Sequence, residues 1–205
     1  MDSWRWTRPA TVATAVIGLV LGGSAPAYAG ASGGGANHVV QTSATVDLPT
    51  VQRGSVQVAP FSGDALDSAN LAIATSTDCT GCRSIAVAFQ GILLGSSPST
   101  FDPGNVATAA NAGCTSCVSF AFAYQDIVST PGPAYLTPSG RAAVAEVSNQ
   151  VAAVAASNDD PVTMCNELSQ LAAAFAAALT DPGNVASAGH PVAVQATFSA
   201  PDCPG

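Results

Sequence analysis

The chain has 205 residues, of which 13 are acidic and only five are basic, and lysine does not occur at all. With a formal net charge of −8 at neutral pH, it lacks the clustered Lys and Arg that nucleic-acid binding requires, and anionic membranes would repel it. Because 48% of the residues are hydrophobic and only 9% are charged, self-association or a cell-envelope partner is left open.

The first 29 residues have the pattern of a secretory signal peptide. Arg5 and Arg8 form a short positive region, residues 10–21 form an apolar stretch, and residues 27–29 (Ala-Tyr-Ala) match an A-x-A cleavage site. The apolar stretch is shorter than the about 20 residues that cross a bilayer. We therefore expect cleavage after Ala29, a secreted or cell-surface location, and no transmembrane segment after cleavage.

The remainder predicts one secreted domain. Residues 30–37 are a flexible, glycine-rich lead-in, and residues 38–205 are long enough to bury a sizeable core. At the start of this domain, residues 39–60 alternate between apolar and polar side chains in two stretches that Pro49 and Gly54 punctuate. This pattern predicts a strand, a turn and a second strand.

A segment of 25 residues then occurs twice, at 70–94 and at 105–129, with 11 identical positions. Each copy contains a C-x-x-C sequence, followed by large apolar residues that alternate with alanines and end in a glutamine. Alternation places the large residues on one face of a strand and the alanines on the other. With the preceding stretch as partner, each copy predicts a β-hairpin whose turn is the C-x-x-C. A helix is the alternative, because Ile85, Phe89 and Leu93 also recur at helical spacing.

Two helices are expected next, at about residues 138–157 and 160–180. Thr137 is an N-cap followed by proline, the second helix starts at an Asp-Pro pair, and it contains the strongly helix-forming LAAAFAAAL.

A partial third repeat is expected at residues 181–198. Its first ten residues, DPGNVASAGH, match DPGNVATAAN at 102–111 in seven positions, and a strand follows without a C-x-x-C. The Asp-Pro-Gly sequence predicts a turn in both copies. Together the elements predict an α+β fold, with an antiparallel sheet of repeated β-hairpins and the two alanine-rich helices packed on one face.

All six cysteines follow the cleavage site, and an even number in an exported chain favours disulfide bonds. The candidates are Cys79, Cys82, Cys114, Cys117, Cys165 and Cys203. Within each C-x-x-C the two cysteines can bond locally, because the ends of a tight turn lie less than about 7 Å apart. Cross-pairing such as Cys79–Cys117 is the alternative if the two turns are neighbours. Cys165 and Cys203 are left to pair, which would hold down the last strand.

Other chemistry is less favoured. Two C-x-x-C sequences also match a four-cysteine zinc site or a redox dithiol, but export favours oxidised cysteines, and Arg83 is the basic residue near the first pair. His38 and His190 are isolated in sequence, and the Asp159-Asp160 pair suits a helix start. Metalloprotease, nucleophile-elbow and phosphate-loop motifs do not occur. We expect no catalytic residues, no metal and no cofactor.

The doubled core CTGCRSIAVAFQ and CTSCVSFAFAYQ resembles a group of exported proteins from high-GC Gram-positive bacteria, whose signature is paired C-x-x-C segments with alternating alanines. The resemblance spans residues 70–129 and implies no established activity. The expected function is a non-catalytic secreted or cell-surface protein, acting as a binding or assembly module of the envelope. The alternative is a cysteine-based metal-binding or thiol-redox protein.

Overall fold

The computed structural model describes residues 37–200, with side chains up to Val192. The strands and helices are β1 (His38–Ala44), β2 (Thr50–Phe61), β3 (Ala65–Thr77), β4 (Arg83–Leu94), β5 (Thr100–Ala112), β6 (Val118–Ser129), β7 (Tyr135–Leu136), α1 (Pro138–Ala156), α2 (Pro161–Thr180), β8 (Val185–Ala186) and β9 (Val192–Ala200). The predicted signal peptide and Cys203 lie outside the described residues.

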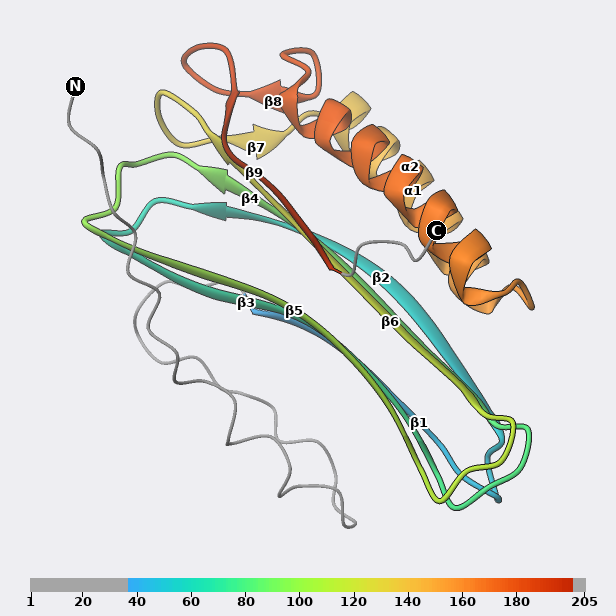
Figure 1. Cartoon of the computed structure of the whole chain (residues 1–205). Coiled ribbons are helices and arrows are strands. Elements are labelled where there is room, and N and C mark those ends of the chain that lie inside the picture. Colours follow the sequence, from blue (N-terminus) through green and yellow to red (C-terminus); the bar gives the residue numbers. More distant parts are fainter. Residues whose placement is uncertain (1–36, 201–205) are drawn as a thin grey trace, which may run out of the picture.

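The first six strands alternate between two sheets. Strands β1, β3 and β5 form sheet A, strands β2, β4 and β6 belong to sheet B, and all of these pairs are parallel. Each strand pairs with its equivalent one repeat away, so that Asn70 lies opposite Asn105 and Ile85 lies opposite Phe120. The chain therefore winds through three stacked coils, each adding one strand to each sheet, as in solenoid proteins (Figure 1).

The predicted antiparallel sheet of β-hairpins is wrong. The strands on either side of a C-x-x-C turn belong to different sheets and do not hydrogen-bond to each other. Apolar and small residues alternate in the same way whether a turn joins two strands of one sheet or two strands of different sheets. The alternation determines which face of a strand each residue occupies, but it does not determine the partner strand.

Parallel stacking brings identical residues together: Gln125 donates to Gln90 at 2.6 Å, and Gln90 donates to Gln57 at 3.4 Å. Such amide ladders stabilise in-register stacks.

Sheet B is the middle of three layers, between sheet A and the helices (Figure 1). A thin layer of small side chains fills the space between the sheets: Val40, Ala72, Ala74, Ala86, Ala88, Ala121 and Ala123. The other face of sheet B carries large residues that pack against the helices, including Ile85, Val87, Phe89, Phe120, Phe122 and Tyr124. Both predicted faces of the alternating segments are therefore buried.

The helices begin at the two prolines that the sequence singled out. The Thr137 side chain accepts from the Gly140 N–H at 3.1 Å, and the Asp160 carboxylate accepts from the Val162 N–H at 2.9 Å. Close approach to sheet B needs a small residue, since a Cβ at Gly54 would lie 2.8 Å from the α1 backbone. Of the helices in the described range, α2 alone has the length and apolar composition of a membrane span. Its buried face, which includes Met164, Leu168 and Phe175, packs in the core against sheet B.

The two copies of the DPGNVA sequence adopt different structures. Residues 102–111 lie within β5, so the turn predicted there is wrong; Pro103 pairs with Ser68 of β3 in extended backbone. Residues 181–190 instead leave α2 through its C-cap, Asp181, and form turns around β8. Strand β9 then returns antiparallel to β6 and covers the free edge of sheet B.

Candidate functional site

The two C-x-x-C turns lie directly on top of one another where β3 leads into β4 and β5 leads into β6 (Figure 1). Thr80 and Thr115 form a parallel bridge between the turns. The Gly81 N–H donates to the Thr115 carbonyl at 2.9 Å, and the Thr115 N–H donates to the Cys79 carbonyl at 3.0 Å. The parallel register of the strands therefore continues through the turns and stacks cysteine over cysteine.

Both turns have the same backbone conformation. The residue before the first cysteine has a positive φ in each case, 50° at Asp78 and 62° at Gly113. The residue before the second cysteine does too, 69° at Gly81 and 55° at Ser116. Glycine, aspartate and, less readily, serine tolerate this left-handed region. The repeated sequence thus produces a repeated turn, which directs the four cysteine side chains to one place.

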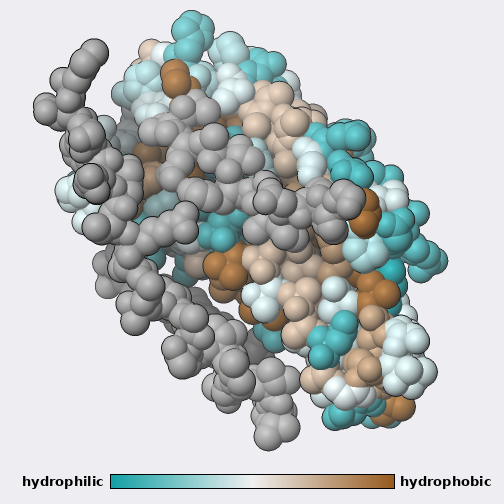
Figure 2. Space-filling view, viewed as in Figure 1, coloured by the Kyte–Doolittle hydropathy of each residue, from teal (hydrophilic) through white to brown (hydrophobic). Residues whose placement is uncertain are grey.

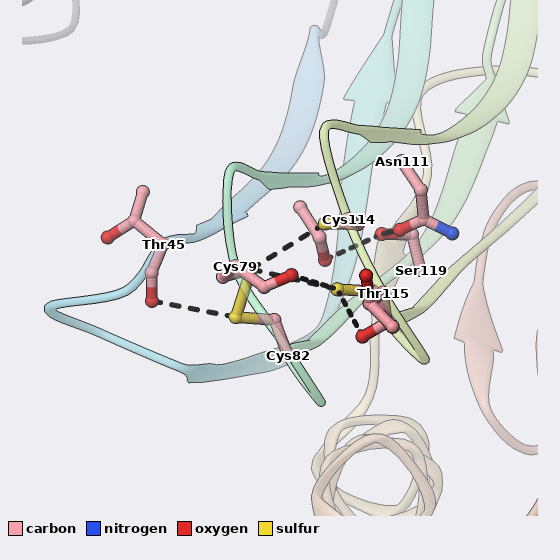
Figure 3. The surroundings of a disulfide bond; sticks show 9 residues. Thr45, Cys79, Cys82, Asn111, Cys114, Thr115 and Ser119 are labelled. Carbon is pink, nitrogen blue, oxygen red and sulfur yellow. Dashed lines mark hydrogen bonds between the residues drawn. A yellow bond between two sulfur atoms is a disulfide. The ribbon is translucent and has the colours of Figure 1, made fainter.

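Four sulfur atoms meet at this end of the coils (Figure 3). Cys79 and Cys82 form a disulfide, while Cys114 and Cys117 carry free thiols. The Cys79 sulfur lies 3.6 Å from that of Cys114 and 3.7 Å from that of Cys117. Cys79 and Cys82 are buried, whereas the other two are half-buried. We call these four residues the sulfur cluster.

The sulfur cluster supports two kinds of chemistry. Tetrahedral zinc with bonds of about 2.3 Å separates its sulfur ligands by about 3.8 Å, close to the spacing of Cys79 from its two neighbours. A thiol beside a disulfide can also exchange with it, provided that the thiol ionises. Desolvation and a hydrogen bond with Cys117 raise the pKa of the Cys114 thiol. Raising the pKa lowers the thiolate population, so the surroundings disfavour exchange at Cys114.

Arg83 bonds to the helix junction. Its guanidinium donates to the backbone carbonyls of Ser157, at 3.2 Å, and Asp159, at 2.7 Å. Both acceptors lie between α1 and α2, so Arg83 ties β4 to the helix junction. The cation next to the first C-x-x-C in sequence therefore has a structural role. Asp160, the other half of the predicted aspartate pair, caps α2.

The structure describes only some of the cysteines for which disulfide bonds were predicted. Cys165 is buried in α2 and is disulfide-bonded. Because Cys203 lies outside the described residues, the Cys165–Cys203 bond stays a prediction. The predicted local bond is present between Cys79 and Cys82. The local bond predicted between Cys114 and Cys117 is wrong for this structure, because both thiols are free.

The two histidines lie in different surroundings. His190 lines a surface hollow together with Ser96 and Thr130. His38 lies between the sheets, where its Nδ1 is 3.0 Å from the Asn70 Oδ1 and its Nε2 is 3.1 Å from the Ser55 Oγ. Sequence reasoning missed this group. The repeat length was the available signal, because His38 precedes Asn70 by 32 residues, nearly one coil.

The outer face of sheet A is a regular, uncharged surface over most of its length. Three rows of side chains cross its strands in register: Val39, Leu71 and Val106; Gln41, Ile73 and Thr108; and Ser43, Thr75 and Ala110. Val39 is 52% exposed and Val106 is 47% exposed, which is high for such apolar residues. We call these nine residues the sheet A face.

Comparisons of this chain with protein-family models, with curated proteins and with solved structures found no match.

Proposed function

We propose that this chain acts outside the cytoplasm, secreted or at the cell surface, as a non-catalytic binding or assembly module of the envelope. The observation that supports this proposal is the sheet A face. Its rows combine exposed valines with hydroxyl and amide side chains and contain no charge. Hydrophobic and hydrophilic residues are also interspersed on the surface seen in Figure 2.

The geometry of the sheet A face suits an extended, uncharged partner such as a neutral glycan. Neighbouring strands lie about 4.8 Å apart and alternate residues about 6.6 Å apart, so the rows form a regular grid. Sheet B buries the inner face of sheet A through the alanine layer, which holds the grid rigid. A rigid surface loses little conformational freedom when it binds.

Binding of the purified chain to envelope fractions tests the proposal. Val106→Glu places a charge on the sheet A face, and we expect at least a tenfold loss of retention, equivalent to about 1.4 kcal/mol. The matched control is Val162→Glu, because Val162 is 39% exposed on α2, away from sheet A. Equal retention of both variants and the parent would contradict the proposal, and light scattering separates self-association from envelope binding.

A second candidate is a soft-metal site in the reduced sulfur cluster, favoured by the sulfur separations of 3.6 and 3.7 Å. The sulfurs of Cys79, Cys82 and Cys117 all lie within 4.8 Å of one another. With the disulfide opened, these three thiolates could hold one zinc ion, with the Cys114 thiolate as a fourth ligand after a shift toward them. We expect the reduced chain to retain about one zinc and Cys117→Ser to lose it, as measured by elemental analysis. If the reduced chain retains no zinc, or if native material has neither free thiols nor metal, this candidate fails.

A further inference from the structure

The first coil differs from the other two at a pair of facing positions between the sheets. In sheet A, His38 occupies the position that Asn70 and Asn105 occupy in the next coils. In sheet B, Ser55 occupies the position of Ala88 and Ala123. An Asn–Ala pair thus becomes a His–Ser pair in one coil only.

The His–Ser pair changes the hydrogen bonds between the two sheets. In the second and third coils the asparagine reaches the backbone of the facing alanine: Asn70 Nδ2 donates to the Ala88 carbonyl at 3.1 Å, and Asn105 Nδ2 donates to the Ala123 carbonyl at 3.0 Å. In the first coil the His38 Nε2 lies 3.1 Å from the Ser55 hydroxyl instead. A bond between side chain and backbone is replaced by one between a base and a hydroxyl.

The surrounding bonds assign the tautomer of His38. The Asn70 amide nitrogen faces three acceptors: the Ala88 carbonyl, the Tyr124 carbonyl and the Asn105 Oδ1. Its oxygen must therefore face His38, and since that oxygen only accepts, the His38 Nδ1 carries the hydrogen. The His38 Nε2 is then the acceptor, and the Ser55 hydroxyl donates to it.

The environment favours a neutral, fixed imidazole. His38 is only 9% exposed, and burial lowers its pKa from 6.5 by more than the bond to Asn70 raises it. Ser55 is half-buried on β2, which within the described residues pairs with β4 alone and so has a free edge. Edge strands carry backbone N–H groups that lack a strand partner, a type of donor that stabilises a developing oxyanion.

We propose that Ser55 is a nucleophile that accepts an acyl group from an activated ester, with His38 as its base and Asn70 as the positioning residue. The Ser55 proton passes to the His38 Nε2 as the Oγ–carbon bond forms. The bond from that carbon to the alcohol leaving group then breaks, and the departing alcohol takes the proton from Nε2. One acyl group per chain needs no turnover, so the inference goes beyond the proposed function without requiring an enzyme.

A fluorophosphonate probe and p-nitrophenyl acetate, each incubated with the folded full chain, test the inference. We expect one label per chain, located by mass spectrometry on the peptide that contains Ser55. Ser55→Ala should abolish the label, and His38→Asn should slow labelling by about 100-fold. Both changes install the residue found at the equivalent position of the other coils, so both variants should fold, which circular dichroism checks.

Matched controls separate this chemistry from general reactivity. Ser119→Ala should label like the parent, because Ser119 bonds to Ser76 and Asn111 rather than to a histidine. Asn70→Ala should slow labelling and change the ¹⁵N shifts that report the His38 tautomer, whereas Asn111→Ala should do neither, because Asn111 bonds to Ser119. An unlabelled parent, a label that persists in Ser55→Ala, or an unchanged rate in His38→Asn would overturn the inference.

The outcomes remain distinct from those of the proposed function. Loss of envelope binding in Val106→Glu with full labelling at Ser55 supports both proposals. Full labelling without envelope binding by the parent overturns the proposed function alone. Continuous ester hydrolysis that Ser55→Ala abolishes supports the nucleophile and contradicts the non-catalytic part of the proposed function.

Discussion

Asp126 is a carboxyl group that the fold buries at a cost. It is 2% exposed on β6, and its Oδ2 has no hydrogen-bond partner within the described structure. Desolvation raises its pKa from 3.8 to about 6, against a smaller lowering by a backbone hydrogen bond from Ile127. The folded chain therefore binds this proton more tightly than the unfolded chain, and the contribution of Asp126 to stability falls as pH rises from about 4 to about 6.

Asp126→Asn should remove this dependence. We expect the variant to gain stability relative to the parent above pH 6, by at most about 3 kcal/mol and by less where solvent screens the charge, and to gain little below pH 4. Urea unfolding of both proteins at pH 4 and pH 8 measures the difference. An identical gain at the two pH values would show that packing, not charge, determines it.

At the scale of elements, β3 and β5 place two carboxylates side by side. Asp67 and Asp102 are directly paired in the parallel register, and both are exposed. Like charges on adjacent strands destabilise a sheet. Asp102→Asn should therefore raise stability by up to about 1 kcal/mol, and salt should reduce the gain because it screens exposed charges. Thermal unfolding at low and high salt checks this; the exposed Asp47, in the turn after β1, provides the control substitution.

The elements also explain what the sequence could predict. Prolines and caps define the helix starts, and alternation in residues 85–90 and 120–125 identifies strand faces. The partner of each strand depends on whether the chain turns back within one sheet or crosses to the other sheet. A C-x-x-C turn is compatible with both connections, so the sequence does not distinguish them. The copies at 102–111 and 181–190 show the same limit, because pairing with β3 extends one while the other follows a helix end.

The candidate sites divide in the same way. The duplicated C-x-x-C predicts that four cysteines lie close together if the two copies stack side by side. The Ser55–His38–Asn70 group joins residues from three strands through the coil register, and no local pattern marks it. Only alignment of the first coil, whose repeat is shorter and weakly similar, could have brought these residues together.

For the whole molecule, the stacking of coils buries some strands more than others, so backbone amides differ in their protection from hydrogen exchange. Strand β4 is flanked by β2 and β6 and covered by sheet A and the helices, and nearly all of its residues are buried. Strand β5 is an edge of sheet A, and every one of its residues is exposed or half-buried. Native-state hydrogen exchange should be slowest in β4, near the global unfolding limit, and much faster in β5. Equal protection of the two strands would contradict this assignment.

The antiparallel return of β9 along β6 has an architectural consequence. Because β9 occupies this edge, a further parallel coil cannot join sheet B there, and the stack of coils ends. The second and third coils, by contrast, pair in one unbroken parallel register. Inserting an additional 35-residue repeat between the second and third coils should therefore lengthen the stack by one coil and leave the first coil and the β9 edge unchanged.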